Sequence, residues 1–262
     1  MVKQITLLFT IFFLAVQSGY AQEKTVAGLY NEGLTLLKAK DYQGGLALME
    51  QALAKAGPDD EKVVGLAKKN GAIAAYNLGN AQRKTGSHDA AIDFYNKGIE
   101  LNPTNSSNYE GIARSQEGKG LKVEAVKAYL DAAAKGEAEG KADKASSRQK
   151  KAETMVGKLF VAKSYPDAIA AGEAYLSMKP NGAEVHYYVS RSYAETGNAE
   201  KAVEHANSAV ANATTPTDKY FYALATQLEA QGNKAEAINA YKKITGEKYK
   251  KQATYKITEL GG

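Results

Sequence analysis

Residues 72–105 decide the fold and read AIAAYNLGNAQRKTGSHDAAIDFYNKGIELNPTN. Their small and apolar side chains recur at helical spacing, which predicts two amphipathic helices on either side of Gly86. Gly86 can adopt a positive φ and end the first helix, and Ser87 offers an oxygen to the free N–H groups of the second. Pro103 cannot continue the second helix, because its nitrogen carries no hydrogen. The stretch therefore predicts a helix pair joined by a tight turn.

The spacing of small residues indicates that this helix pair is repeated along the chain. Gly79 and Ala91 leave room for two helix backbones to approach where they cross. A small residue equivalent to Ala91 recurs at intervals of 46, 34, 43, 34 and 35 residues. Three intervals equal 34 within one residue, so the two longer ones indicate short insertions. The members of this series are Gly45, Ala91, Ala125, Ala168, Ala202 and Ala237.

The pattern resembles the tetratricopeptide repeat, a 34-residue helix pair. Its consensus has a small residue late in the first helix, Ala early in the second, an aromatic residue four positions on and a closing Pro. Here these positions hold Gly79, Ala91, Tyr95 and Pro103. Ala75 stands where a large aromatic residue is usual. An unrelated helical bundle is the alternative, and the repeated spacing of small residues argues against it.

The resemblance implies an all-α protein, a right-handed α-α superhelix (solenoid) of about six helix pairs in one domain over residues 22–262. We expect the repeats at about 26–59, 72–105, 106–139, 149–182, 183–216 and 218–251. The insertions 60–71 and 140–148 are rich in Lys and lack Pro, so we expect them to lengthen neighbouring helices. The amphipathic tail 252–260 is expected to be a capping helix, because a terminal repeat exposes an apolar face.

The first 21 residues differ from the rest. Lys3 precedes a twelve-residue apolar run over 5–16, and small residues at Gly19 and Ala21 suit cleavage by signal peptidase. The alternative is a membrane anchor, but twelve residues are too few for a hydrocarbon core that needs about 20 in a helix. We therefore expect residues 1–21 to be a signal peptide and the protein to be exported, either periplasmic or secreted. No later segment is apolar enough to span a membrane.

Composition excludes several kinds of site. The chain has no Cys, which rules out disulfides, thiolate metal sites and a lipid anchor on a lipobox cysteine. The net charge of +5 is mild for 262 residues and gives no concentrated basic stripe, so no nucleic-acid partner is expected. No phosphate-binding, zinc-protease or nucleophile-elbow motif occurs. We predict no enzyme activity and no cofactor.

Two further clusters have both a purely structural and a functional interpretation. His186 and His205 could approach each other, and a metal site would need a carboxylate such as Glu184 or Glu204 nearby. Ordinary packing of the histidines is the preferred interpretation, so no metal is predicted. The lysine-rich segment 242–256 could contact an anionic surface and allow peripheral association with the envelope, whereas a solvated helix end is the simpler interpretation.

The resemblance also implies a concave groove lined by the first helix of each pair, where the family usually binds peptides. Tyr and Arg are common at binding hot spots, and Asn side chains can pair with a ligand backbone. The residues expected to face this groove are Tyr30, Asn31, Tyr76, Asn77, Asn80, Arg83, Arg114, Tyr187, Tyr188, Arg191 and Tyr222. Tyr76 and Asn77 also follow the repeat consensus, where both are common without a ligand.

Some family members hold a C-terminal carboxylate in a clamp of Lys and Asn residues from three successive repeats. The positions that would supply the basic residues hold Tyr30, Ser107 and Gly111, so the resemblance does not extend to this clamp.

The sequence therefore predicts a non-enzymatic scaffold or adaptor in the cell envelope that binds a peptide or protein partner in its groove. A structural subunit of an envelope assembly, with contacts at its ends or convex face, is the alternative. An enzyme or metal binder that uses His186 and His205 is the third possibility.

Overall fold

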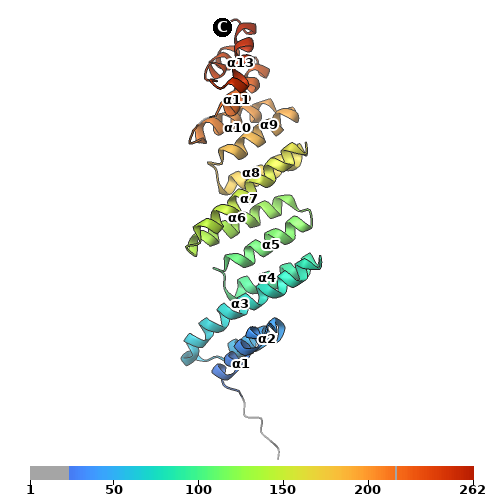
Figure 1. Ribbon diagram of the computed structural model, residues 1–262, viewed down its shortest axis with the longest axis vertical. Coiled ribbons are helices and arrows are strands. Elements are labelled where there is room, and N and C mark those ends of the chain that lie inside the picture. Colours follow the sequence, from blue (N-terminus) through green and yellow to red (C-terminus); the bar gives the residue numbers. More distant parts are fainter. Residues whose placement is uncertain (1–23, 216) are drawn as a thin grey trace, which may run out of the picture.

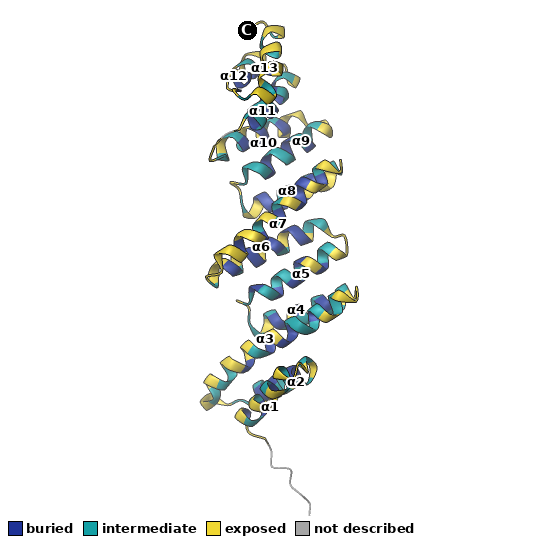
Figure 2. Ribbon diagram, viewed as in Figure 1, coloured by how far each residue is buried: buried dark blue, intermediate teal, exposed yellow. Residues whose placement is uncertain are grey.

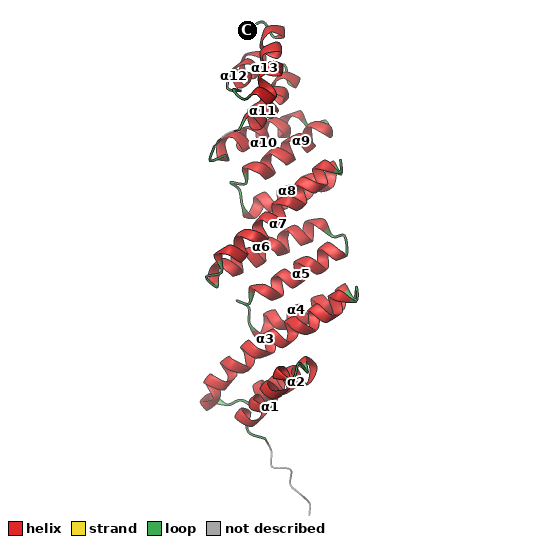
Figure 3. Ribbon diagram, in the orientation of Figure 1, coloured by secondary structure: helices red, strands yellow, loops and turns green. Residues whose placement is uncertain are grey.

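The computed structural model describes residues 24–215 and 217–262, so the predicted signal peptide 1–21 lies outside the described residues. The helices stack one upon another into a long, narrow molecule (Figure 1). Every regular element in the described ranges is a helix (Figure 3). The predicted all-α solenoid is confirmed.

The helices form six successive pairs and one terminal helix. Within each pair the two helices pack on each other, and each pair packs on the next. The pairs are α1 (Val26–Lys38) with α2 (Tyr42–Lys55), α3 (Glu61–Lys84) with α4 (His88–Leu101), α5 (Ser106–Gly118) with α6 (Lys122–Ala138), α7 (Ala142–Val161) with α8 (Tyr165–Met178), α9 (Ala183–Glu195) with α10 (Ala199–Asn212) and α11 (Asp218–Ala230) with α12 (Lys234–Tyr241). A short 3-10 helix (Pro58–Asp60) precedes α3, and α13 (Glu247–Glu259) ends the chain.

Both insertions lengthen helices, as expected. The helix α3 begins at Glu61 and α7 begins at Ala142, so each insertion adds turns to the N-terminal end of a first helix. These are the two longest helices of the described chain, at 24 and 20 residues.

The C-terminal cap begins earlier than predicted. Helix α12 ends at Tyr241 and α13 begins at Glu247, so the predicted sixth repeat 218–251 includes the first turn of α13. Asp218 explains the boundary, because its carboxylate accepts hydrogen bonds from the backbone N–H groups of Thr245 (3.1 Å) and Gly246 (2.6 Å). These bonds fix the link between the two helices. Ala253 of α13 is buried in the cluster formed with α11 and α12.

Close helix packing in the N-terminal half surrounds Tyr95, whose side chain is fully buried. The ring lies between Gly79 of α3 and Gly111 of α5, and a β-carbon at either glycine would overlap it. The Tyr95 hydroxyl donates to Asn80 Oδ1 at 2.9 Å. One side chain thus joins α3, α4 and α5, and buried residues continue along the inner faces of the helices (Figure 2).

The junction between the third and fourth pairs differs from its neighbours. First helices pack closely on each other at α1–α3, α3–α5, α7–α9 and α9–α11, whereas α5 and α7 lie further apart. Here α6 packs on both α7 and α8 instead. Arg148 of α7 bridges the gap: its Nη1 donates to the Ala132 carbonyl at 3.0 Å and its Nε donates to Glu110 Oε2 at 2.8 Å. The joint therefore has polar contacts on the side of the first helices.

Candidate functional site

Two hollows of the described chain open between first helices, and a third opens between the last first helix and the terminal helix. One of about 570 Å³ lies among α3, α5 and α7, and one of about 420 Å³ lies between α7 and α9. A third of about 470 Å³ lies between α11 and α13. The predicted groove residues that line them are Arg83 and Arg114 in the first, Tyr188 in the second and Tyr222 in the third.

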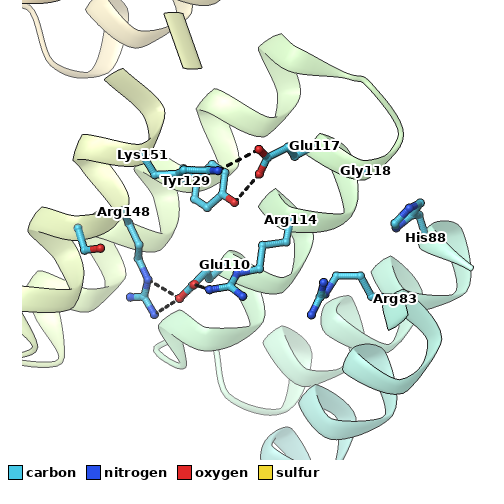
Figure 4. Close-up of a pocket in the computed structure, with 10 residues that line it drawn as sticks. Arg83, His88, Glu110, Arg114, Glu117, Gly118, Tyr129, Arg148 and Lys151 are labelled. Atoms are coloured by element: carbon cyan, nitrogen blue, oxygen red, sulfur yellow. Dashed lines mark hydrogen bonds and ion pairs between the residues drawn. The ribbon is translucent and has the colours of Figure 1, made fainter. Parts of the chain in front are cut away.

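The largest of these, called the arginine hollow below, is strongly charged (Figure 4). It carries four cations and two carboxylates, which leaves a net charge of +2. This charge is set mainly by side chains of first helices that point towards one another across the hollow. The lining residues are Arg83, His88, Glu110, Arg114, Glu117, Gly118, Tyr129, Ser147, Arg148 and Lys151.

Glu110 is shared by two arginines. Arg148 pairs with its Oε2 at 2.8 Å, and Arg114, four residues on along α5, pairs with its Oε1. Burial acts to raise the pKa of the Glu110 carboxyl, but the hydrogen bonds and charges of Arg148 and Arg114 together outweigh it and hold this pKa below its ordinary value. Glu110 therefore remains ionised and fixes both guanidinium groups.

Glu117 makes the second link from α5 to α7. It accepts from the Tyr129 hydroxyl at 2.9 Å and pairs with Lys151 at 3.0 Å. Burial of the Glu117 carboxyl acts to raise its pKa, and the bonds from Lys151 and Tyr129 lower it by more, so this pKa also lies below its ordinary value.

These lowered pKa values predict acid sensitivity. A carboxyl whose pKa is lower in the folded state stabilises the fold above its unfolded pKa and loses that contribution as the pH falls through the folded pKa. We expect the free energy of unfolding to decrease as the pH drops from 4.5, the ordinary carboxyl pKa, into the lowered range. Urea unfolding at a series of pH values below and above 4.5 measures this decrease in the free energy of unfolding. The Glu110→Gln variant should show a shallower decrease than the unmodified protein, and an equal slope would contradict the assignment to Glu110.

Arg83 is a cation of the arginine hollow without an ion-pair partner among the described residues. Within residues 24–215 and 217–262 it forms no ion pair, and its buried Nε has no hydrogen-bond partner. The guanidinium lies near the Tyr95 hydroxyl: burial raises the pKa of that phenol, and Arg83 partly opposes the rise. His88 is similar, because its ring packs over Gly118 while its buried Nδ1 lacks a partner.

Aromatic rings dominate the C-terminal part. The tyrosine row consists of Tyr187, Tyr188, Tyr220, Tyr222 and Tyr249. Ring centroids lie 5.5 Å apart for Tyr187–Tyr188, 5.8 Å for Tyr187–Tyr220 and 5.1 Å for Tyr222–Tyr249. The Lys219 ammonium lies 5.2 Å from the Tyr187 centroid and 4.9 Å from that of Tyr220. Such rings give rigid contact area with polar edges, which suits protein recognition.

Arg191 extends this aromatic surface. Its guanidinium carbon lies 5.9 Å from the Phe160 centroid, and Phe160 in turn lies 5.7 Å from Tyr188. The structure thus brings Tyr187, Tyr188 and Arg191 together on and around α9.

Several predicted groove residues already have partners within the protein. The Tyr30 hydroxyl accepts from Asn70 Nδ2 at 3.1 Å, and Asn77 Nδ2 donates to the Ile73 carbonyl at 2.8 Å. Asn80 holds the Tyr95 hydroxyl, and the Tyr76 ring lies 6.0 Å from that of Tyr95. These contacts give the asparagines a structural role. Asn31 is exposed on α1, apart from the three hollows.

Sequence reasoning missed Arg148 and Lys151 as groove residues. Their spacing of three residues places both on one face of a helix, but Arg148 belongs to the segment 140–148, which resembles a lysine-rich helical extension, and Lys151 to the start of the predicted repeat 149–182. Their position in the arginine hollow depends on the separation of α5 and α7, which no local pattern encodes.

The histidine pair satisfies its own hydrogen bonds. His186 Nδ1 lies 2.9 Å from His205 Nδ1, and His186 Nε2 lies 2.8 Å from the Pro180 carbonyl. The carboxylate that pairs with the histidines is Glu173, 3.2 Å from His205 Nε2, and not one of the two named as examples in the metal-site hypothesis, Glu184 and Glu204. Burial lowers the pKa of His205. The described residues contain no cluster of three or more side chains suited to a metal ion.

The helices of residues 24–215 and 217–262 also lack a membrane-spanning candidate. None of them combines the length and apolar character that crossing a bilayer requires.

Comparison with known proteins places two segments of the chain in one family. A tetratricopeptide-repeat model matches residues 72–105, and a second model with the same description matches residues 159–218. No curated protein matches the sequence.

Similar solved structures share little sequence with this chain. The P58(IPK) TPR domain is 16% identical over 90% of this chain with a TM-score of 0.38, and the match spans 64% of that domain's chain. The TPR2AB domain of yeast Sti1, in complex with a pHSP90 partner, is 14% identical over 90% of this chain and 98% of its own, with a TM-score of 0.38. TTC0263, a TPR protein of Thermus thermophilus, is 18% identical over 90% of this chain and 98% of its own, with a TM-score of 0.32.

Proposed function

Because this chain is a tetratricopeptide-repeat protein, we propose that it is a non-enzymatic scaffold that binds a segment of a partner protein along its first helices. The observation that carries the proposal is the row of hollows along the first helices, at α3–α5–α7, at α7–α9 and between α11 and the terminal helix α13. Side chains from both ends of this row are of the types that dominate binding hot spots, namely Arg and Tyr.

The cell envelope is the proposed location. Its support is the sequence of residues 1–21, whose basic start, apolar run and small residues suit a signal peptide. A structural subunit of an envelope assembly, with contacts at its ends or convex face, is the rival function, and the C-terminal end argues against contacts there. Helix α13 already covers the apolar face of the last pair, with Ala253 and Ile244 both buried there.

Single substitutions in the tyrosine row test the groove. We expect Tyr187→Ala and Tyr222→Ala each to weaken binding of a captured partner by about tenfold or more, because Tyr222 lines the hollow between α11 and α13 and Tyr187 packs on Tyr188, which lines the hollow between α7 and α9. Affinity capture from the native cell fraction identifies the partner, and calorimetry on the purified pair measures its Kd.

Tyr109→Ala is the matched control. The Tyr109 hydroxyl donates to the Pro103 carbonyl, and Lys135 lies over its ring, so this tyrosine is engaged away from the three hollows. Its removal should leave the Kd unchanged. Equal Kd values for all three variants and the unmodified protein would refute binding along the first helices.

A further inference from the structure

We propose that the arginine hollow binds a carboxylate side chain of the partner segment, so that the partner presents Asp or Glu at this point of the groove. The inference rests on the proposed function, since it names the chemistry of the segment that the groove binds. The carboxylate would sit between Arg83 of α3 and Arg114 of α5, with Lys151 of α7 on the far side (Figure 4).

Charge gives the first support. The hollow has a net charge of +2 after both of its carboxylates are counted, and residues of α3, α4, α5, α6 and α7 line it. Attraction between opposite charges is stronger in such a partly enclosed site than in bulk water. An anionic side chain therefore gains more here than at an exposed lysine on the same protein.

Unused donors give the second, independent support. Arg83 forms no ion pair in the described ranges, its buried Nε has no hydrogen-bond partner, and its guanidinium interacts with the Tyr95 hydroxyl alone, which leaves Nη donors for a ligand. Arg114 gives only Nη2 to Glu110 in the described contacts, and its side chain is about half exposed. A guanidinium has five N–H donors in a planar fork that matches a carboxylate, so both arginines have capacity left for a ligand.

The existing ion pairs prepare the site rather than fill it. Glu110 is committed to Arg114 and Arg148 at once, and Glu117 to Lys151 and Tyr129. These pairs hold Arg114, Arg148 and Lys151 in place before a ligand arrives, which reduces the entropy lost on binding.

The shape of the hollow favours a protein segment. Its volume of about 570 Å³ lies between helices, where a side chain and its neighbours can enter but the flat surface of a bilayer cannot. The site also differs from the terminal-carboxylate clamp considered above. Its cations stand at Arg83, Arg114 and Lys151, not at the positions held by Tyr30, Ser107 and Gly111.

Selection from a random-peptide phage library tests the inference without knowledge of the partner. The full mature chain is the bait, and the same selection is run on the Arg83→Gln/Arg114→Gln variant. We expect peptides enriched by the unmodified protein to be rich in Asp and Glu, and this enrichment to disappear with the variant. Peptides that lack acidic enrichment would overturn the proposal.

Fluorescence anisotropy with a selected peptide then measures how much the Kd depends on the two arginines. Charge-assisted hydrogen bonds are strong, so we expect the double variant, or replacement of the peptide's Glu by Gln, to weaken binding by about tenfold or more. The control Lys127→Gln/Lys144→Gln removes the same net charge from exposed positions on α6 and α7 outside the hollow and should change the Kd by less than about twofold. Equal losses in both double variants would show a general charge effect and overturn the proposal.

Two further measurements separate this inference from the proposed function. Circular dichroism must show the same melting curve for both double variants, which is expected because Gln preserves helix propensity and Glu110 keeps its bond to Arg148. If selected peptides depend on Tyr187 and Tyr222 but not on Arg83 and Arg114, the carboxylate site is wrong and the groove stands. If no peptide depends on either set, both proposals fail.

Discussion

Tyr95→Ala is expected to lower the free energy of unfolding by about 4 kcal/mol, the range for removal of a buried aromatic side chain. The ring is fully buried and lies between Gly79 and Gly111, so it contacts helices of two successive pairs. Two glycines leave no side chains that could collapse into the space, and the cavity would persist. Guanidinium chloride unfolding, followed by circular dichroism, measures the loss.

Tyr95→Phe is the control for this variant. It keeps the ring between the glycines and removes only the hydroxyl that donates to Asn80 Oδ1 at 2.9 Å, which should cost about 1 kcal/mol. Because repeat arrays can unfold in parts, the curves need a nearest-neighbour fit rather than a two-state one. Equal losses for the two variants would mean that the hydroxyl, and not the ring, stabilises this junction.

Arg148→Met is expected to lower the free energy of unfolding by about 3 kcal/mol, as when one partner of a buried ion pair is removed. The Arg148 side chain is only 4% exposed and bonds both Glu110 and the Ala132 carbonyl. Methionine has a similar length but cannot donate to either group. Glu110 would keep Arg114 alone, and the contact between α5 and α7 through this pair would be lost.

Lys151→Met is the matched control, one turn further along α7. Lys151 also reaches α5, where it pairs with Glu117 at 3.0 Å, but its side chain is 40% exposed. Exposed pairs contribute about 0 to 1 kcal/mol, so this loss should be small. Denaturant unfolding of both variants gives the comparison. A loss at Lys151 as large as that at Arg148 would show that burial of Arg148 does not decide the effect.

The sequence predicted the parts of this fold that local chemistry determines. The turn glycines are one example: Gly86, Gly120, Gly197 and Gly232 all adopt φ near 80°, in the left-handed region that glycine enters without steric cost. The series of small residues in second helices is another, because close helix packing requires it at the same position of each repeat. Six helix pairs followed from these two signals.

Two turns show the limit of such signals. Lys40 and Lys163 occupy the position of the turn glycine in the first and fourth pairs, and both adopt positive φ, at 65° and 60°. Lysine gives no local cue for this conformation. The equivalent position in the other pairs, rather than the residue type, identifies these turns.

Long-range contacts account for what the sequence did not reveal. The start of α13 depends on Asp218, which is 28 positions away from the Gly246 N–H that it bonds. The arginine hollow depends on the separation of α5 and α7, and Arg148 enters it from a segment that resembles a plain helical extension. Asn80 follows the repeat consensus, yet its role is to hold a buried phenol.

The joint between α5 and α7 is held differently on its two sides. On one side of the stack it is held by a continuous apolar cluster that includes Val126 and Leu130 of α6 and Leu176 of α8. On the other side it is held by ion pairs from Glu110 and Glu117, the latter partly exposed to solvent. Salt weakens exposed ion pairs and leaves apolar packing largely intact. The two sides of this joint should therefore differ in their dependence on ionic strength: added salt weakens the partly exposed Glu117–Lys151 pair, while the apolar cluster and the buried Arg148 keep their contacts.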